Sequence, residues 1–273
     1  MSRLLRDLFG VEKPIVAMVH LSALPGRPAH AREAGMGPIV EAVARDVEAL
    51  QGAGVDGLLF CNEADLPYQL RVGPEAAAAM AAVIGQVRGV IWRPFGVDLV
   101  WDPTASLAAA RATGACFIRE VVSGVYESDL GVMRPDLGAI ADHRAQIGAG
   151  SVAIFGNITP EFASPLGHRS IPQRARSAVS LGVEALLISG PITGTATDLD
   201  QLSAAKAAVP QTPVLANTGV TAETVGAVLA VADGAIVGTH LKRDGVTWNP
   251  VDRDRACRFM EAVGRTREPA GVH

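Results

Sequence analysis

The feature that most constrains the fold is a repeated unit, in which a short β-rich run is followed by a helical pattern. Continuous apolar runs of this kind are typical of strands covered on both faces, as in a parallel sheet. The eight predicted strands are residues 14–20, 55–61, 95–100, 115–121, 151–157, 184–190, 212–217 and 234–239. The predicted helices are residues 37–52, 74–88, 103–112, 135–148, 171–181, 198–208, 221–231 and 250–265.

Eight βα units in succession, with no linker or change of composition between them, predict an α/β protein with a single (β/α)8 TIM barrel. The alternative is a doubly wound open sheet. No G-x-G-x-x-G motif follows the first predicted strand, and no G-x-x-x-x-G-K-[ST] motif occurs in the chain. We therefore expect one domain over residues 1–273, with residues 1–13 as an N-terminal extension and 266–273 as a flexible tail.

Composition and charge exclude several classes of protein. The formal net charge of −4 argues against a general nucleic-acid-binding surface, which needs clustered basic residues. No apolar run is long enough to span a membrane, and the N-terminus lacks a signal-peptide pattern. Three widely spaced cysteines (Cys61, Cys116 and Cys257) are most simply reduced thiols. These features predict a cytoplasmic protein with a small-molecule partner. They are also compatible with a homo-oligomer.

The stretch "VLANTGVTAETVGAVL" (214–229) predicts a strand that breaks into a turn and restarts as a helix. In (β/α)8 barrels, phosphate is often bound after strands seven and eight. We therefore expect phosphate at two loops, whose residues are Thr218, Gly219, Val220, Gly238, Thr239 and Lys242. The alternative is a plain connection in which Gly219 makes the turn and Thr221 caps the helix. If phosphate binds here, a β-branched residue at Gly219 should block the ligand and leave the fold intact.

Acid–base candidates lie at the predicted strand ends, where barrel enzymes hold their catalytic groups. His20 ends the first strand, while Asp98, Asp102 and Glu120 come from strands three and four. Carboxylates gathered in a low-dielectric mouth raise the pKa of at least one of them, which suits proton transfer. They could also hold Mg²⁺, but no spaced His/carboxylate signature accompanies them, so no metal ligand and no cofactor is assigned.

Each of these acids also has a structural interpretation. Asp98 and Asp102 could pair with Arg93 or Arg119, and Asp102 precedes Pro103 as a helix cap would. His20 could be bonded to the loop that follows it. Because side chains alternate along a strand, one of Arg119 and Glu120 should point into the barrel. The remaining candidate substrate-binding residues at strand ends are Asn62, Arg119, Asn157, Ser189 and Gly190.

The chain resembles the BtpA/SgcQ family of β/α-barrel proteins. The resemblance implies a β/α barrel; one member is linked to photosystem I assembly, and others look like enzymes of sugar-related operons. The segments that carry the resemblance are "HLSALPG" (20–26), "GVDG" (54–57), "FIR" (117–119), "PLG" (165–167), "ISGPITG" (188–194), "IVGTHLK" (236–242) and "NPVD" (249–252).

The chain departs from the family pattern at the ends of strands two to five. Cys61 replaces a usual Glu, and Asp98 and Asp102 replace a usual pair of asparagines. Further departures stand at Val121 after strand four and at Asn157, Glu161 and Phe162 after strand five. We therefore expect that the barrel scaffold is the same as in the family and that the residues at the catalytic ends of the strands differ.

Together these patterns predict an enzyme of isomerase, lyase or aldolase type, acting on a phosphorylated sugar or nucleotide-like metabolite. Two alternatives remain at this point. One is a non-catalytic assembly or regulatory factor of the photosystem I biogenesis type. The other is a barrel that has lost activity and senses its ligand.

Overall fold

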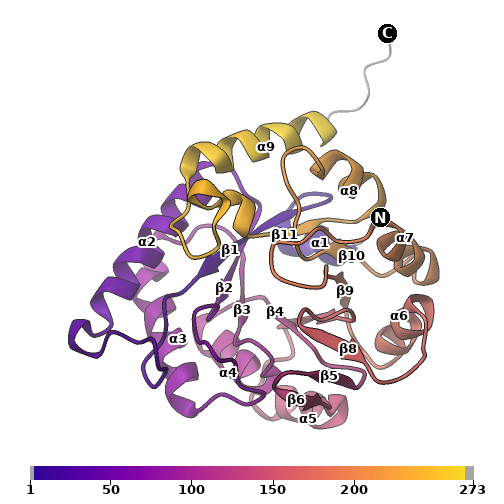
Figure 1. Cartoon of the computed structure of the whole chain (residues 1–273), viewed down its shortest axis with the longest axis horizontal. Helices are drawn as coiled ribbons and strands as arrows, with labels where there is room; N and C mark the ends of the chain where they lie inside the picture. Colours follow the sequence, from indigo (N-terminus) through magenta and orange to yellow (C-terminus); the bar gives the residue numbers. More distant parts are fainter. Residues whose placement is uncertain (1–2, 268–273) are drawn as a thin grey trace.

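A closed barrel of eight parallel strands lies at the centre of the molecule (Figure 1). The computed structural model describes residues 3–267. Strand β1 pairs with both β2 and β11, so the sheet closes and the predicted (β/α)8 barrel is confirmed over an open sheet. The barrel strands are β1 (Ile15–His20), β2 (Gly57–Cys61), β3 (Phe95–Asp98), β4 (Phe117–Glu120), β7 (Ala153–Asn157), β9 (Ala185–Ile188), β10 (Val214–Ala216) and β11 (Ala235–Val237).

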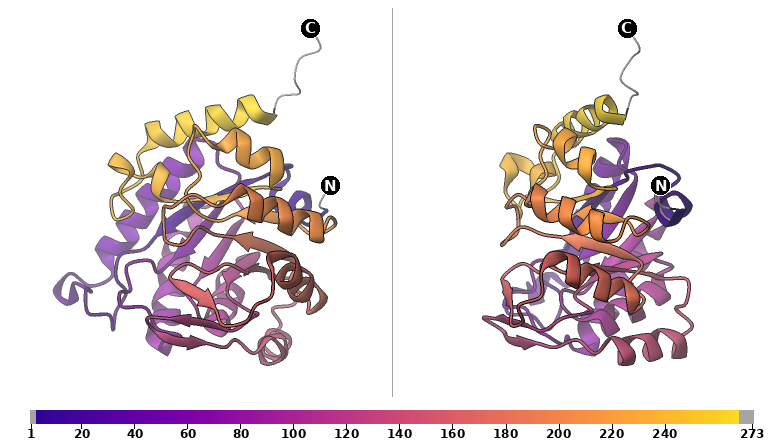
Figure 2. Two further views of the ribbon diagram at one scale, coloured as in Figure 1. Left: turned by 45° about the vertical axis from the view of Figure 1, so that its right-hand side comes forward. Right: turned by 90° about the vertical axis from the view of Figure 1, so that its right-hand side faces the viewer.

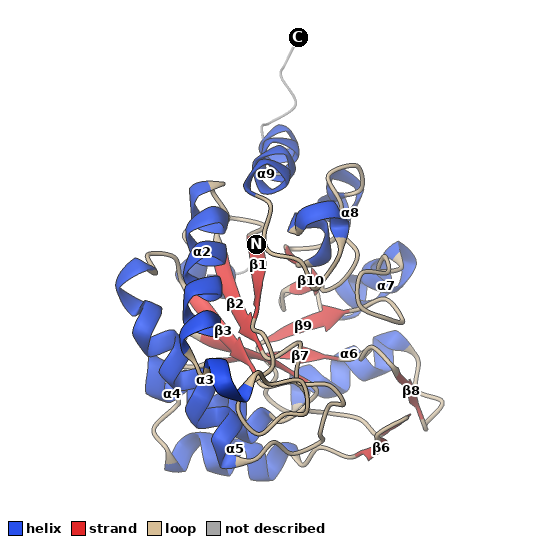
Figure 3. Cartoon of the chain, turned by 60° about the vertical axis from the view of Figure 1, so that its left-hand side comes forward, coloured by secondary structure: helices blue, strands red, loops and turns tan. Residues whose placement is uncertain are grey.

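Helices surround the strands (Figure 3), and apolar side chains fill the space between them. None of the described helices combines the length and the apolar character that crossing a membrane needs. The helices of the ring are α2 (Gly37–Gly52), α3 (Pro74–Val87), α4 (Pro103–Thr113), α5 (Leu137–Gln146), α6 (Ile171–Ser180), α7 (Leu199–Ala208), α8 (Val225–Val231) and α9 (Arg253–Arg267). Short 3₁₀ turns are η1 (Arg32–Ala34), η2 (Arg88–Val90), η3 (Thr239–Leu241) and η4 (Arg243–Gly245).

Several helix ends differ from the expected ones by one to four residues. Helix α8 begins at Val225 rather than at residue 221, because the hydroxyl of Thr224 accepts from the amide of Thr221 and holds residues 221–224 as a turn. Helix α9 continues to Arg267, two residues into the stretch expected as a tail. Residues 268–273 of that tail lie outside the described residues.

The N-terminal end of the barrel is closed by a helix that was expected only as an extension. Helix α1 (Arg3–Phe9) packs Leu5 and Phe9 against the side chains inside the barrel. Phe9 contacts Phe117 edge to face, with ring centroids 5.7 Å apart, and Phe117 stacks on Phe155 at 4.6 Å. These rings form an apolar floor, so the only polar interior is at the opposite end of the described barrel.

A second, three-stranded antiparallel sheet stands beside the barrel mouth. It consists of β5 (Tyr126–Ser128), β6 (Gly131–Met133) and β8 (Ala163–Pro165). The right view of Figure 2 shows this sheet and α1 toward opposite ends of the barrel. The long loop after β4 therefore folds as a hairpin, and its pairing with β8 holds the segment that carries Glu161 and Phe162.

Candidate active site at the barrel mouth

The floor and the mouth are made by the same alternation of side chains along the strands. Phe117 points into the barrel, and so does Arg119 two residues later. Likewise Met18 is followed by His20 at the end of β1. Register places His20 beside Cys61, and Cys61 beside Asp98, on three neighbouring strands. The last inward position of several strands is therefore polar and lies at one level.

Arg119 is the central cation of the mouth. Its Nε donates to Asp98 Oδ2 over 2.6 Å, and its second terminal nitrogen lies 2.5 Å from the same oxygen. Its other terminal nitrogen donates to Asn217 Oδ1 over 3.4 Å. Burial lowers the pKa of Arg119, but Asp98 and other nearby acids raise it further, so the net shift is upward. The guanidinium stays charged, and its pairing with Asp98 confirms the structural interpretation of that acid.

Glu120 does not line the mouth cavity, because it points outward from β4 toward helix α4. The hydroxyl of Ser106 donates to its Oε1 over 2.5 Å. Its Oε2 is buried without a partner among the described residues. Burial, followed by the nearby charge of Asp98, raises the pKa of Glu120 well above its usual range. Of Arg119 and Glu120, the inward residue is thus the arginine.

Asp102 caps helix α4 and does not reach the mouth cavity. Its Oδ1 accepts from the amide of Ala105 over 3.0 Å, and its Oδ2 accepts from the amide of Val72 over 3.0 Å. Both oxygens are therefore occupied by backbone donors. Asp102 therefore stands apart from the expected cluster, while Asp98 and Glu120 line a small space beside Arg119 that is separate from the mouth cavity.

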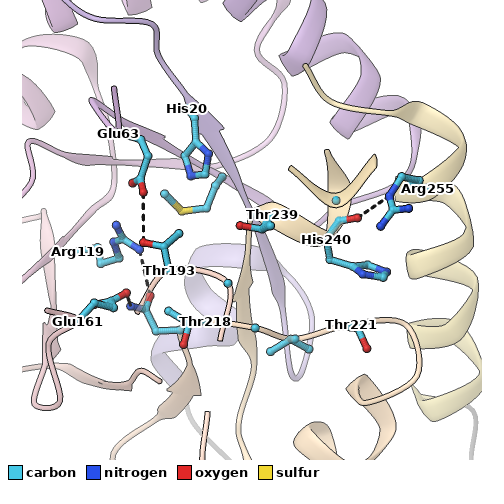
Figure 4. A pocket seen from close by; sticks show the side chains of 17 residues that line it. His20, Glu63, Arg119, Glu161, Thr193, Thr218, Thr221, Thr239, His240 and Arg255 are labelled. Atoms are coloured by element: carbon cyan, nitrogen blue, oxygen red, sulfur yellow. Dashed lines mark hydrogen bonds between the residues drawn. The ribbon is translucent and has the colours of Figure 1, made fainter. Parts of the chain in front are cut away.

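A cavity of about 220 Å³ opens at the mouth, and its walls come from both ends of the chain (Figure 4). Glu63, Arg119 and Glu161 stand on one side of it, which we call the acidic half. His240 and Arg255 stand on the other side, with His20 between the two. We call the side formed by the loops after β10 and β11 the amide half.

Two carboxylates in the acidic half were not among the predicted catalytic residues. Burial raises the pKa of Glu63 and of Glu161, and Arg119 opposes both shifts. Glu63 accepts from the Thr193 hydroxyl over 3.4 Å, and Glu161 accepts from Asn217 Nδ2 over 3.4 Å. The position of Glu63 two residues beyond β2 indicates a ligand contact, whereas Glu161 stands out in the sequence only as a departure from the family pattern after the fifth barrel strand.

His20 lies between the halves of the cavity, as its position at the end of β1 predicted. Burial lowers the pKa of His20 well below its usual value, and the charges of Lys242 and Arg119 lower it further. The imidazole is therefore neutral at neutral pH. Its Nδ1 is buried and has no partner among residues 3–267, so it is free to bond a ligand.

The amide half brings together five of the residues predicted to bind phosphate. The loop after β10 contributes Thr218, Gly219 and Val220, and the loop after β11 contributes Gly238 and Thr239. Within the described chain, the amides of the last four donate to no protein acceptor. Of these four residues only Val220 is buried, and the other three are half-buried, so their amides are open to an acceptor that enters the cavity. A ligand oxygen would satisfy them.

Gly219 is needed for packing as well as for access. Its φ is +64°, and a Cβ at this position would lie 2.2 Å from the carbonyl carbon of Thr195 and 2.3 Å from the nitrogen of Ala196. A β-branched residue would push the loop after β9 away. The expectation that such a substitution leaves the fold intact is therefore wrong.

Lys242 is not part of the cavity, which corrects its expected role. It is buried, and its Nζ donates to Asp46 Oδ2 over 2.9 Å. The cation that lines the amide half is Arg255, from helix α9. Its Nε donates to the carbonyl of His240 over 2.9 Å, and its terminal nitrogens have no acceptor within the described chain.

The other predicted binding residues lie behind the cavity wall and support it. Asn62 donates to Asp65 Oδ2 over 2.8 Å and accepts from the amide of Val100. Asn157 donates to the Ser189 hydroxyl over 2.9 Å. The amide of Gly190 donates to the hydroxyl of the cavity residue Thr218 over 2.6 Å.

No cluster of three or more His, Cys, Asp or Glu side chains that could hold a metal ion occurs within residues 3–267. The mouth instead concentrates one paired arginine, two carboxyls and one neutral imidazole. Such groups can donate and accept hydrogen bonds and can exchange protons.

Comparison with known folds places the barrel among solved (β/α)8 structures. It superposes on GGGPS from Thermoplasma volcanium with a TM-score of 0.61, at 13% identity over 98% of this chain and 99% of that one. It superposes on thiamine phosphate pyrophosphorylase from Pyrococcus furiosus with a TM-score of 0.57, at 16% identity over 96% and 99%. At these identities the likeness shows the fold alone.

Sequence comparison gives relatives that match nearly the whole chain. The chain is 46% identical over 264 residues to the putative sgc region protein SgcQ of Escherichia coli, covering 96% of this chain and 98% of that protein. It is 29% identical to the photosystem I biogenesis protein BtpA of Synechocystis, covering 93% and 89%. The pattern of the BtpA family matches residues 11–265. The chain therefore belongs to the BtpA family.

Proposed function

We propose that this protein is an enzyme that binds a phosphorylated sugar or nucleotide-like metabolite at the barrel mouth and transfers protons on its carbon skeleton. The observation that carries this proposal is the pairing of two unlike halves in one cavity. Unbonded amides and Arg255 line one half, and two carboxyls flank Arg119 in the other. Isomerase, lyase and aldolase reactions all fit.

The amide half suits a phosphoryl group. Phosphate oxygens accept several hydrogen bonds at once, and backbone amides of glycine-containing loops let them approach closely. A charge-assisted bond from an arginine is short and strong, and its planar fork matches two phosphate oxygens. The terminal nitrogens of Arg255 are available for such a bond, whereas the Nζ of Lys242 is held by Asp46.

The acidic half suits general acid–base catalysis. A carboxyl whose pKa is raised toward neutrality exchanges protons effectively at neutral pH. We assign Glu63 as the group that takes a proton from a carbon beside a substrate carbonyl. Arg119 then stabilises the negative charge that develops on the carbonyl oxygen. Glu161, which starts protonated, donates its own proton to the neighbouring atom, and exchange with water then removes the proton from Glu63 and restores that of Glu161, so that the proton count balances.

A Schiff-base aldolase does not fit this cavity, because no lysine is among the residues that line it. The proposed setting is the cytoplasm, in keeping with the free thiols of Cys61, Cys116 and Cys257. A homo-oligomer is compatible with the proposal. The name of the Synechocystis relative suggests a non-catalytic role for that protein. Such a role would give no reason for unbonded amides and an acidic half in one cavity.

The test is a calorimetric titration of the protein with ribose 5-phosphate, inorganic phosphate and ribose. Ribose 5-phosphate and inorganic phosphate should both bind, and ribose should bind far more weakly. Arg255→Gln should weaken binding of ribose 5-phosphate by about tenfold, the value of one charge-assisted hydrogen bond.

The matched control is Arg265→Gln, an exposed position on the same helix outside the cavity. It should leave the affinity unchanged. Equal affinities of the two variants, or no binding of either phosphorylated ligand, would overturn the proposed phosphate site.

A further inference from the structure

We propose that the end of the substrate opposite the phosphate is a planar aromatic ring, held in an apolar cleft beside the mouth cavity. This inference rests on the proposed function and names the substrate class more narrowly, as a phosphorylated compound that carries a nucleobase-like ring. Three features carry it: the aromatic side chains of the cleft, its position next to the mouth cavity, and the acceptors at its edge.

The cleft has a volume of about 460 Å³, and four aromatic side chains line it together with apolar and polar ones. Tyr68 and Trp101 form one wall, with ring centroids 5.7 Å apart and planes at 58°. Phe162 and Trp248 also line it and are 44% and 58% exposed. Large aromatic side chains that gather around an exposed cleft usually mark a site that binds a ligand or a partner.

The cleft and the mouth cavity share two lining residues, Glu63 and Thr193. The bond from the Thr193 hydroxyl to Glu63 makes these two residues a common wall. The hydroxyl of Tyr68 donates to the carbonyl of Glu63 over 3.0 Å, which ties the aromatic wall to the acidic half. The two spaces are therefore neighbours on either side of Glu63, and a ligand that spans them would place its reacting carbons beside this residue.

The lining favours a heterocycle over an alkyl chain. Flat rings stack on aromatic side chains, and the face of every base can do so. The polar groups of the cleft include the carboxylates of Glu63 and Asp129, which accept hydrogen bonds. Such acceptors match the N–H groups at the edge of a base and would be left unpaired by a hydrocarbon.

The experiment compares affinities by calorimetry for ribose 5-phosphate, the four ribonucleoside 5′-monophosphates, and octyl phosphate. At least one nucleotide should bind about tenfold more tightly than ribose 5-phosphate, the effect of one stacked base. Trp248→Ala should remove this gain and leave the affinity for ribose 5-phosphate unchanged. Trp92→Ala, an exposed tryptophan outside the cleft, is the matched control and should keep the gain.

The outcomes separate this inference from the proposed function. If ribose 5-phosphate binds and no nucleotide binds more tightly, or octyl phosphate binds more tightly than every nucleotide, the ring assignment is wrong and the phosphate site stands. If ribose 5-phosphate does not bind, the phosphate site fails. In that case adenosine and cytidine are titrated: binding that Trp248→Ala weakens supports the ring site, and absence of binding overturns it as well.

Discussion

The floor and the mouth of the barrel interior differ sharply, although the same strands build both. On β4, Phe117 contacts two aromatic rings at the floor, one edge to face and one stacked, and two residues later Arg119 is held among carboxylates and amides at the mouth. On β7, Phe155 is followed in the same way by Asn157. The floor is apolar and closed by α1, while the mouth is polar and open.

This difference teaches how one set of short strands serves two purposes. Burying apolar rings stabilises the fold in proportion to the area removed from water. Buried charges add little stability and need partners, so their concentration at the mouth indicates function. Substitutions at the floor should therefore change stability, and substitutions in the cavity should change binding.

The largest expected effect is at the floor. Phe117→Ala should lower the free energy of unfolding by about 4 kcal/mol, because it removes a fully buried ring and leaves a cavity. Urea unfolding measures this loss. Phe162→Ala, at an exposed ring, should change stability by less than about 0.5 kcal/mol, and similar losses for the two variants would contradict the distinction.

Lys242→Met tests whether a charge near the mouth belongs to the fold. Removing the ammonium leaves Asp46 buried without its cation, and stability should fall by about 3 kcal/mol. The affinity for ribose 5-phosphate should stay unchanged, in contrast to Arg255→Gln. Lost affinity with unchanged stability would return Lys242 to the phosphate site.

Glu120→Gln should alter the pH dependence of stability. The folded pKa of Glu120 is raised above its unfolded value, so its stabilising contribution is full below the ordinary carboxyl pKa and is lost as pH rises through the folded pKa. Glutamine keeps an oxygen that can accept from Ser106 and has no proton to lose. The variant should therefore lack this loss of stability at higher pH.

As the pH rises from acidic to alkaline, the free energy of unfolding of the Glu120→Gln variant should therefore increase relative to that of the wild type. A tenfold difference in proton affinity between the folded and unfolded carboxyl corresponds to about 1.4 kcal/mol of this gain. Chemical unfolding from pH 4 to 9 measures the difference. A difference between the two proteins that does not change with pH would show that Glu120 keeps the same protonation state on folding.

The smallest effect on stability is expected for Thr221→Asp, at the rim of the amide half. Stability should change by less than about 0.5 kcal/mol, since the position is on a turn. The added carboxylate should weaken binding of ribose 5-phosphate about fivefold, as roughly 1 kcal/mol of repulsion implies. Ser170→Asp, at the exposed N-cap of α6, carries the same charge and should leave binding unchanged.

Much of the scaffold was predictable from local sequence. All eight barrel strands lie within the predicted runs or overlap them, and α2 has the predicted bounds. The cap at Asp102 was also open to prediction, because a cap depends on residues only a few positions away. Local propensity and period determine such elements, so their signals are contained in short windows of sequence.

The cavity could be predicted only in part. The loops after β10 and β11 follow from their place in an eight-strand order, and five of their predicted residues line the cavity. Glu161 lies in a loop, and Arg255 lies on a helix that was predicted without any sign that it reaches the cavity. Their approach to the mouth depends on the β5–β8 pairing and on the packing of α9, which no local pattern reveals.

The sequence by itself determined the repeated βα unit, and with it the barrel and the level of the strand ends. The tertiary structure decided which polar groups face the cavity. It turned Arg119 inward and Glu120 outward, because uniformly apolar strands do not reveal the phase of their alternation. It also bonded Lys242 to Asp46, 196 residues away, since only closure of the barrel brings the ends of the chain together.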